Sequence, residues 1–158
     1  MIKLFLFIAL FFSGLNLKVL ANVFFRENDL LSTKLKKTRV VALTSLTADL
    51  ISTISKDSLV GIPGSSILKK NKEFNSIPIV SSGRMPPDLE KILSLKPDLV
   101  IGAKGFHDRP LSKLNSLGIS TLSTSISSLD DLDNLNKKLA SKLKTSTKSL
   151  EDILGSCY

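Results

Sequence analysis

The sequence predicts an α/β domain built on an open, mostly parallel sheet with helices on both faces. Two observations support this fold class. The first is that the chain contains five short, mainly apolar runs, each long enough for one buried strand. The second is that these runs alternate with stretches whose apolar residues recur at helical spacing. This order of strand and helix favours parallel pairing with right-handed crossovers, because each helix returns the chain to the start of the next strand.

The predicted strands are short, mainly apolar runs, and the first of them is β-branched and uninterrupted, as expected for a strand covered on both faces. They are Arg39–Leu43, Leu59–Ile62, Ile77–Val80, Leu99–Gly102 and Ile119–Leu122. The second strand ends at Pro63–Ser66 and the third at Ser81–Gly83, two segments whose Pro, Gly and Ser content stops regular structure and exposes backbone amides.

The predicted helices are amphipathic, with apolar residues three or four positions apart. Their apolar sets are Leu46, Leu50, Ile51 and Ile54; Leu89, Ile92 and Leu93; Leu111, Leu114 and Leu117; Leu132, Leu135, Leu139 and Leu143; and a final Leu150, Ile153 and Leu154. Ser45 or Thr44 is expected to cap the first helix. Pro86 and Pro87 introduce the second helix, and Gly118 ends the third.

The N-terminus has the pattern of a signal peptide. Lys3 precedes an apolar run from Leu4 to Phe12, and the segment closes with Val19-Leu20-Ala21, which predicts cleavage after Ala21. The run of about nine residues is shorter than the roughly 20 needed to cross a bilayer. The residues just after it contain no cysteine for lipid attachment. We therefore expect residues 1–21 to direct export of a free periplasmic protein, and residues 22–38 to form an N-terminal extension.

The net charge of +8 raises the possibility of nucleic-acid binding. The lysines are spread over the helical patterns, however, without aromatic residues for base stacking, and an export signal argues against that role. Cys157 is the only cysteine, so no disulfide forms within the chain.

The sequence gives little support to catalysis. The nucleophile elbow G-x-S-x-G, the phosphate loop G-x-x-x-x-G-K-[ST] and the dinucleotide motif G-x-G-x-x-G are all absent. His107 is the only histidine, and beside Asp108 it makes a poor metal site, because stable binding normally takes three or four ligands. We expect neither a cofactor nor a metal bound directly by the protein.

Three stretches together resemble the periplasmic binding proteins of ABC importers for iron-siderophore complexes and cobalamin. They are Arg39–Asp49, Leu59–Ile62 and Asp88–Ile101, and the third carries the most specific pattern, LEKIL-x-LKPDLVI. The resemblance implies a Rossmann-like lobe over residues 39–145. In this family two such lobes are joined by a long helix and hold the ligand between them, and each lobe docks on one permease subunit.

Family members are nearly twice as long, so we expect this chain to be the N-terminal lobe, with residues 146–158 beginning a truncated inter-lobe helix. The resemblance implies capture of a ferric siderophore, haem or corrinoid for an ABC permease. Two alternatives stay open: a truncated remnant that binds nothing, and, with less support, an α/β enzyme. The sequence does not decide among the chelates and leaves the oligomeric state open.

Ligands of open parallel sheets bind beyond the carboxyl ends of the strands. The loops expected there are Ser45–Thr47, Pro63–Ser66, Ser82–Met85 and Lys104–Asp108, with Arg109 beyond the last. The residues predicted to contact the ligand are Ser45, Ser65, Arg84, Lys104 and Phe106. The two cations suit an anionic chelate and the phenyl ring an apolar face. Alternatively, Arg84 and Lys104 are solvated loop charges.

Glu90 matches the surface glutamate that family members carry on this helix to form a salt bridge with a permease arginine. The resemblance therefore implies a docking role for Glu90. The alternative is an acidic side chain that stabilises the N-terminus of its own helix by a few tenths of a kcal/mol.

Overall fold

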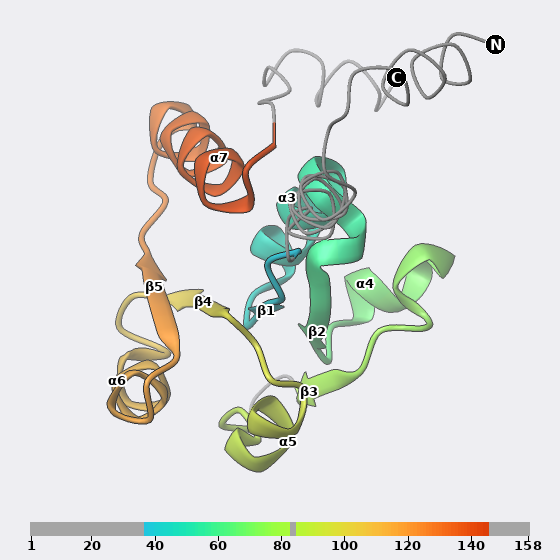
Figure 1. Cartoon of the computed structure of the whole chain (residues 1–158). Helices are drawn as coiled ribbons and strands as arrows, with labels where there is room; N and C mark the ends of the chain where they lie inside the picture. The colour runs from blue at the N-terminus through green and yellow to red at the C-terminus, as the bar shows by residue number, and fades with distance from the viewer. Residues whose placement is uncertain (1–36, 83–84, 146–158) are drawn as a thin grey trace, which may run out of the picture. The chain divides into compact units, whose positions relative to one another are not determined.

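The computed structural model describes residues 37–82 and 85–145. Their five strands form one parallel sheet in the order β3-β2-β1-β4-β5 (Figure 1). In chain order the elements are β1 (Val40–Ala42), α3 (Ser45–Ser55), η1 (Lys56–Ser58), β2 (Leu59–Pro63), α4 (Ser66–Lys70), η2 (Lys72–Phe74), β3 (Ile79–Ser81), α5 (Leu89–Ser94), β4 (Leu99–Ala103), α6 (Asp108–Ser116), β5 (Ser120–Thr124) and α7 (Leu129–Leu143).

Every strand pair in this sheet is parallel, as predicted. The first strand, β1, lies at the centre between β2 and β4, and the chain adds strands first on one side and then on the other. The register between β4 and β5 is continuous from Leu99, opposite Ser120, to Ala103, opposite Thr124. Because all the strands are parallel, all five end at the same edge of the sheet, the carboxyl edge, and each connection that follows a strand begins there.

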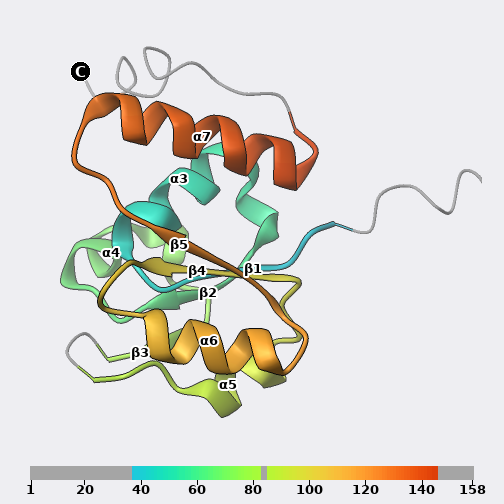
Figure 2. The same ribbon diagram turned by 90° about the vertical axis from the view of Figure 1, so that its left-hand side faces the viewer.

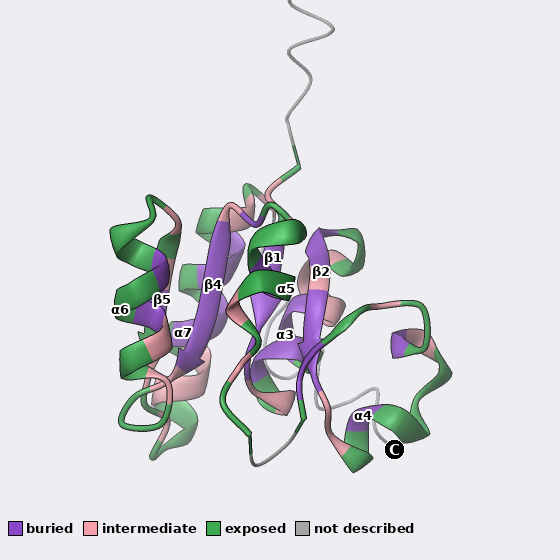
Figure 3. Ribbon diagram, turned by 90° about the horizontal axis from the view of Figure 1, so that it is seen from below, coloured by how far each residue is buried: buried purple, intermediate pink, exposed green. Residues whose placement is uncertain are grey.

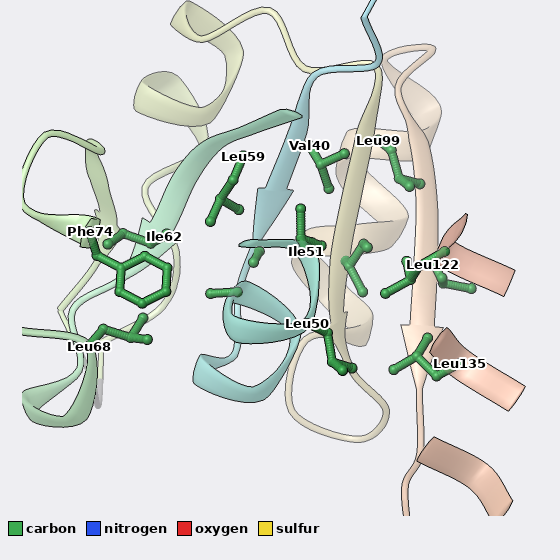
Figure 4. Close-up of a cluster of buried hydrophobic side chains, with 14 residues drawn as sticks. Val40, Leu50, Ile51, Leu59, Ile62, Leu68, Phe74, Leu99, Leu122 and Leu135 are labelled. Atoms are coloured by element: carbon green, nitrogen blue, oxygen red, sulfur yellow. The ribbon is translucent and has the colours of Figure 1, made fainter. Parts of the chain in front are cut away.

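Helices cover both faces, as Figure 2 shows. α3 and α7 pack on one face, where their apolar side chains join Val40 and Ala42 in the cluster drawn in Figure 4. α5 and α6 pack on the other, where Ile92 and Leu114 join Val41. Side chains alternate between the faces of a strand, so uninterrupted apolar runs are needed to supply both clusters.

The sequence did not predict the segment between β2 and β3. The turn of α4 followed by η2 replaces part of the expected loop, and it is anchored by Leu68 and Phe74, which are buried in the larger cluster. A five-residue helix is too short to show a helical period.

Three leucines assigned to buried helix faces are exposed: Leu46, Leu93 and Leu117. Each lies in the first or last turn of its helix or at its cap. Strand limits also differ: β3 begins at Ile79, and β5 runs on to Thr124.

Capping explains several helix ends. Thr44, rather than Ser45, caps α3, and its Oγ1 accepts a hydrogen bond from the Thr47 amide at 3.2 Å. At the start of α7, Ser128 and Asp131 form a reciprocal capping box. Gly118 has φ +84, which confirms its expected role in ending α6.

The other predicted segments lie outside the described residues. These are the signal peptide, most of the N-terminal extension, and the final helical pattern at Leu150, Ile153 and Leu154. Within 37–82 and 85–145, no helix combines the length and hydrophobicity required to cross a bilayer.

Candidate ligand-binding site

The sheet has a topological switch point between β1 and β4. The connection after β1 leads to α3 on one face, whereas the connection after β4 leads to α6 on the other, and these are the two strands between which the strand order reverses. Such a point leaves a crevice at the carboxyl edge, the usual ligand site of an open α/β sheet. Of the predicted contact residues, Ser45 follows β1, and Lys104 and Phe106 follow β4.

Two hydrogen bonds from backbone amides to side chains of the same turn stabilise the β4–α6 turn. The Ala103 amide donates to His107 Nδ1 at 3.0 Å, and the Gly105 amide donates to Asp108 Oδ2 at 2.9 Å. Gly105 has φ +84, a conformation that glycine adopts without strain. Phe106 lies between these anchored residues with 90% of its surface exposed. A ring this exposed on an ordered turn contributes little to the core and is available to a ligand.

The imidazole of His107 packs so closely on β4 that a Cβ at Gly102 would lie 2.7 Å from the Cβ of His107. Burial lowers the pKa of His107 from 6.5, and the charge of Asp108 opposes that shift. The bond from the Ala103 amide requires an unprotonated Nδ1, so the neutral ring is the form that fits this turn. No group of three or more His, Cys, Asp or Glu side chains among the described residues is arranged to hold a metal ion.

The two predicted serines differ in what their hydroxyls do. Because Thr44 provides the cap, the Ser45 hydroxyl makes no hydrogen bond within the described parts of the chain. Ser65 caps α4, and its Oγ accepts from the Ile67 amide at 3.2 Å. Neither segment is the loop expected from the sequence: Ser45–Thr47 is the first turn of α3, and Ser66 already belongs to α4.

The structure places the basic residues predicted at this edge in different positions, or leaves them undescribed. Lys104 is exposed on the β4–α6 turn, and its backbone amide is fixed by a 2.8 Å bond to the carbonyl oxygen of Thr124. Arg109 lies in the first turn of α6 rather than in a loop. Arg84 is outside the described residues, so its predicted contact with a ligand remains a prediction.

The structure adds a row of exposed apolar side chains at the carboxyl edge. Each of the five connections that follow a strand contributes one, and their exposed fractions range from 44% to 90%. The row consists of Leu46, Ile67, Met85, Phe106 and Leu129. Sequence reasoning found only Phe106, because the others stand beside capping or loop residues and resemble the start of a helix core. Only Leu129, which directly follows the cap residue Ser128, carried a local signal in its position.

The predicted docking residue, Glu90, lies in the first turn of α5, the helix that follows β3. Its side chain is exposed and forms no ion pair with another described residue. The N-cap of this helix is Asp88, whose Oδ1 accepts from the Lys91 amide at 3.0 Å. Asp88 thus caps the helix, and Glu90, in its first turn, also fits the alternative of an acidic side chain that stabilises the helix N-terminus.

Comparison with known proteins places this fold in a family. The family model for periplasmic binding proteins matches residues 40–151, which is more than half of the chain. The chain therefore belongs to the periplasmic binding protein family, a class of solute-binding proteins, and the described domain corresponds to a single lobe. A search of curated proteins found no match.

Similar solved structures agree with this family. An ABC transporter substrate-binding protein from Listeria monocytogenes EGD-e is 30% identical with a TM-score of 0.58, covering 69% of this chain and 41% of that one. A periplasmic heme binding protein from Pseudomonas aeruginosa is 25% identical with a TM-score of 0.56, covering 68% and 39%. The vitamin B12 binding protein BtuF of Vibrio cholerae has the same fold at 24% identity and a TM-score of 0.58, covering 76% and 44%. This chain spans less than half the length of each.

Proposed function

We propose that this chain is the substrate-binding component of an ABC importer and captures a metal chelate for an inner-membrane permease. The chelate is a ferric siderophore, haem or a cobalamin-like corrinoid. The observation that carries the proposal is the row of apolar side chains at the switch-point edge, one from each connection, with Lys104 among them. An organic chelator with apolar faces and anionic groups matches this combination.

The proposed contacts are Ser45, Ser65, Arg84, Lys104 and Phe106. Phe106 covers an apolar face of the chelate, and Lys104 and Arg84 pair with its anionic groups. The hydroxyls of Ser45 and Ser65 donate hydrogen bonds to its oxygens. The metal arrives already coordinated by the chelator, so the protein supplies no ligand set for it.

Capture is proposed to take place in the periplasm. The supporting sequence is the pattern of Lys3, the apolar run from Leu4 and the closing Val19-Leu20-Ala21. Two similar structures are described as periplasmic proteins that bind vitamin B12 and heme. Size and N-terminal sequencing of the exported protein test this proposal, which requires a chain that starts at Asn22.

Ligand binding is tested by calorimetric titration of the purified chain from Asn22 to Tyr158 with ferric siderophores, haem and cobalamin. The chain has no tryptophan, so quenching of added fluorescent reporters gives a second readout against a low background. Micromolar or tighter binding to one compound supports the proposal and identifies the ligand. A folded protein that binds none of them would instead be a remnant of a binding protein.

Delivery is proposed to involve a salt bridge from Glu90 to a permease arginine. The test is uptake, by cells that depend on this protein, of the chelate that the titration identifies. Glu90→Gln should reduce uptake without changing chelate affinity, whereas Asp49→Asn, which removes an exposed acid from α3, should change neither. Equal uptake in both variants would contradict a docking role for Glu90.

A further inference from the structure

A basic segment follows β2, next to the candidate ligand site. Lys69, Lys70 and Lys72 are exposed in or directly after α4, and no described acid forms an ion pair with any of them. Glu73 is the only acid between β2 and β3, and its Oε1 lies 2.9 Å from Lys56 Nζ. The hydrogen bond with Lys56 is the main cause that lowers the pKa of Glu73. The three lysines therefore present an uncompensated positive charge.

An apolar side chain stands beside these lysines. Ile67 is 72% exposed in the first turn of α4, and Lys70 lies three residues further along the same helix. Residues three apart share a face of a helix. The segment thus combines one projecting aliphatic side chain with flanking cations, the combination that favours the boundary between lipid headgroups and acyl chains.

The segment is attached firmly enough to act as a docking surface. Leu68 and Phe74, on either side of the lysines, are buried in the larger core cluster. Asn71 caps the turn between them, since its Oδ1 accepts from the Glu73 amide at 3.0 Å. Figure 3 shows α4 as a largely exposed element at the periphery of the domain. Binding through this surface would need little ordering of the chain.

We propose that Ile67, Lys69, Lys70 and Lys72 form a docking surface for anionic lipid headgroups. Because α4 begins at the carboxyl edge of the sheet, this surface lies on the same side of the domain as the candidate ligand site and shares Ile67 with it. Its use in the cell rests on the proposed delivery to a membrane permease: lipid attraction would concentrate the loaded protein at the bilayer that holds the permease. Lipid binding itself requires no chelate.

The test is sedimentation of the chain from Asn22 to Tyr158 with vesicles, without chelate. Both core clusters lie within residues 40–139, so this chain retains the whole folded domain. Vesicles of phosphatidylglycerol and phosphatidylethanolamine are compared with neutral phosphatidylcholine vesicles. We expect binding to the anionic vesicles alone, and weaker binding at 0.5 M salt, where surface charges are screened over roughly 4 Å.

Variants localise the effect. Each lysine near an anionic surface contributes about fivefold to binding, so Lys69→Gln, Lys70→Gln and Lys72→Gln together should reduce the partition coefficient on the order of a hundredfold. The matched control replaces the same charge elsewhere, with Lys113→Gln, Lys138→Gln and Lys142→Gln on α6 and α7, and should lose less than about threefold because contact with the surface decays within a Debye length. Ile67→Ser should also weaken binding, but without changing its salt dependence.

Circular dichroism confirms that the variants remain folded before their binding is compared. Equal losses in the two triple variants would overturn the proposal, because they would show a general effect of net charge. Failure of the unmodified chain to bind anionic vesicles would overturn it as well. Either result leaves the chelate titration unaffected, so this proposal and the proposed function fail separately.

Discussion

Replacing Phe106 with alanine tests the candidate site most directly. The ring is 90% exposed and makes no contribution to either core cluster. Surface substitutions of this kind usually change the free energy of unfolding by less than about 0.5 kcal/mol. Phe106→Ala should therefore leave the melting temperature nearly unchanged, which separates an effect on binding from an effect on folding.

The effect on binding follows from the area that a ligand would cover. An aromatic side chain buries about 150–250 Å² in full, so contact on one face covers roughly 100 Å². At ~25 cal/mol per Å², that contact contributes ~2.5 kcal/mol. Since each 1.4 kcal/mol is tenfold in affinity, Phe106→Ala should raise the Kd of the chelate by about 60-fold.

The assay is calorimetric titration with the chelate that the unmodified protein binds. Leu117→Ala is the matched control, because Leu117 is also a large exposed apolar residue but lies at the other end of α6, away from the carboxyl edge. It should leave the Kd unchanged. A Kd within threefold of the unmodified value for folded Phe106→Ala, or equal losses in both variants, would refute the reasoning about the β4–α6 turn.

Three further predictions concern stability. A Cβ at residue 64 would lie 2.5 Å from the Ser81 carbonyl oxygen, so Gly64→Ala should cost about 1–3 kcal/mol in chemical unfolding; an unchanged midpoint would contradict the close approach of β2 and β3. Ser128→Ala should cost ~1 kcal/mol by removing the capping box of α7, whereas Ser128→Asp should retain most of the stability, measured by thermal melting. Burial lowers the pKa of His107 from 6.5, so the stability that its neutral form contributes is complete above pH 6.5 and declines as the pH falls through that value; the melting temperature should decline more between pH 6.5 and 5 in the unmodified protein than in His107→Gln.

Helices and strands could be predicted where the spacing of apolar residues repeats often enough to be recognised. The leucines of α7 recur over four turns, and Leu135 and Leu139 are buried as the spacing predicts. The alternation of strands and helices likewise predicted a parallel sheet, which the strand pairing confirms. The α4–η2 segment was missed because its burial depends on two residues, Leu68 and Phe74, brought against the sheet by tertiary packing.

The candidate site was less predictable for a related reason. Phe106 and Lys104 follow a strand directly, so their position at the carboxyl edge could be inferred from the order of elements. Leu46 and Ile67 have the same hydrophobicity as core residues, and nothing in the local sequence separates them from Leu50 or Leu68. Only the direction of the first helical turn after each cap determines which side chain points to solvent.

The parallel sheet keeps the parts of the candidate site independent of one another. Each apolar residue of the row is on its own connection, and a complete helix and strand separate it in the sequence from the next. None of the five belongs to a core cluster. Mutation at one position would thus change one part of the proposed binding surface without removing a core side chain, so single substitutions could alter which ligand that surface prefers while the fold is kept.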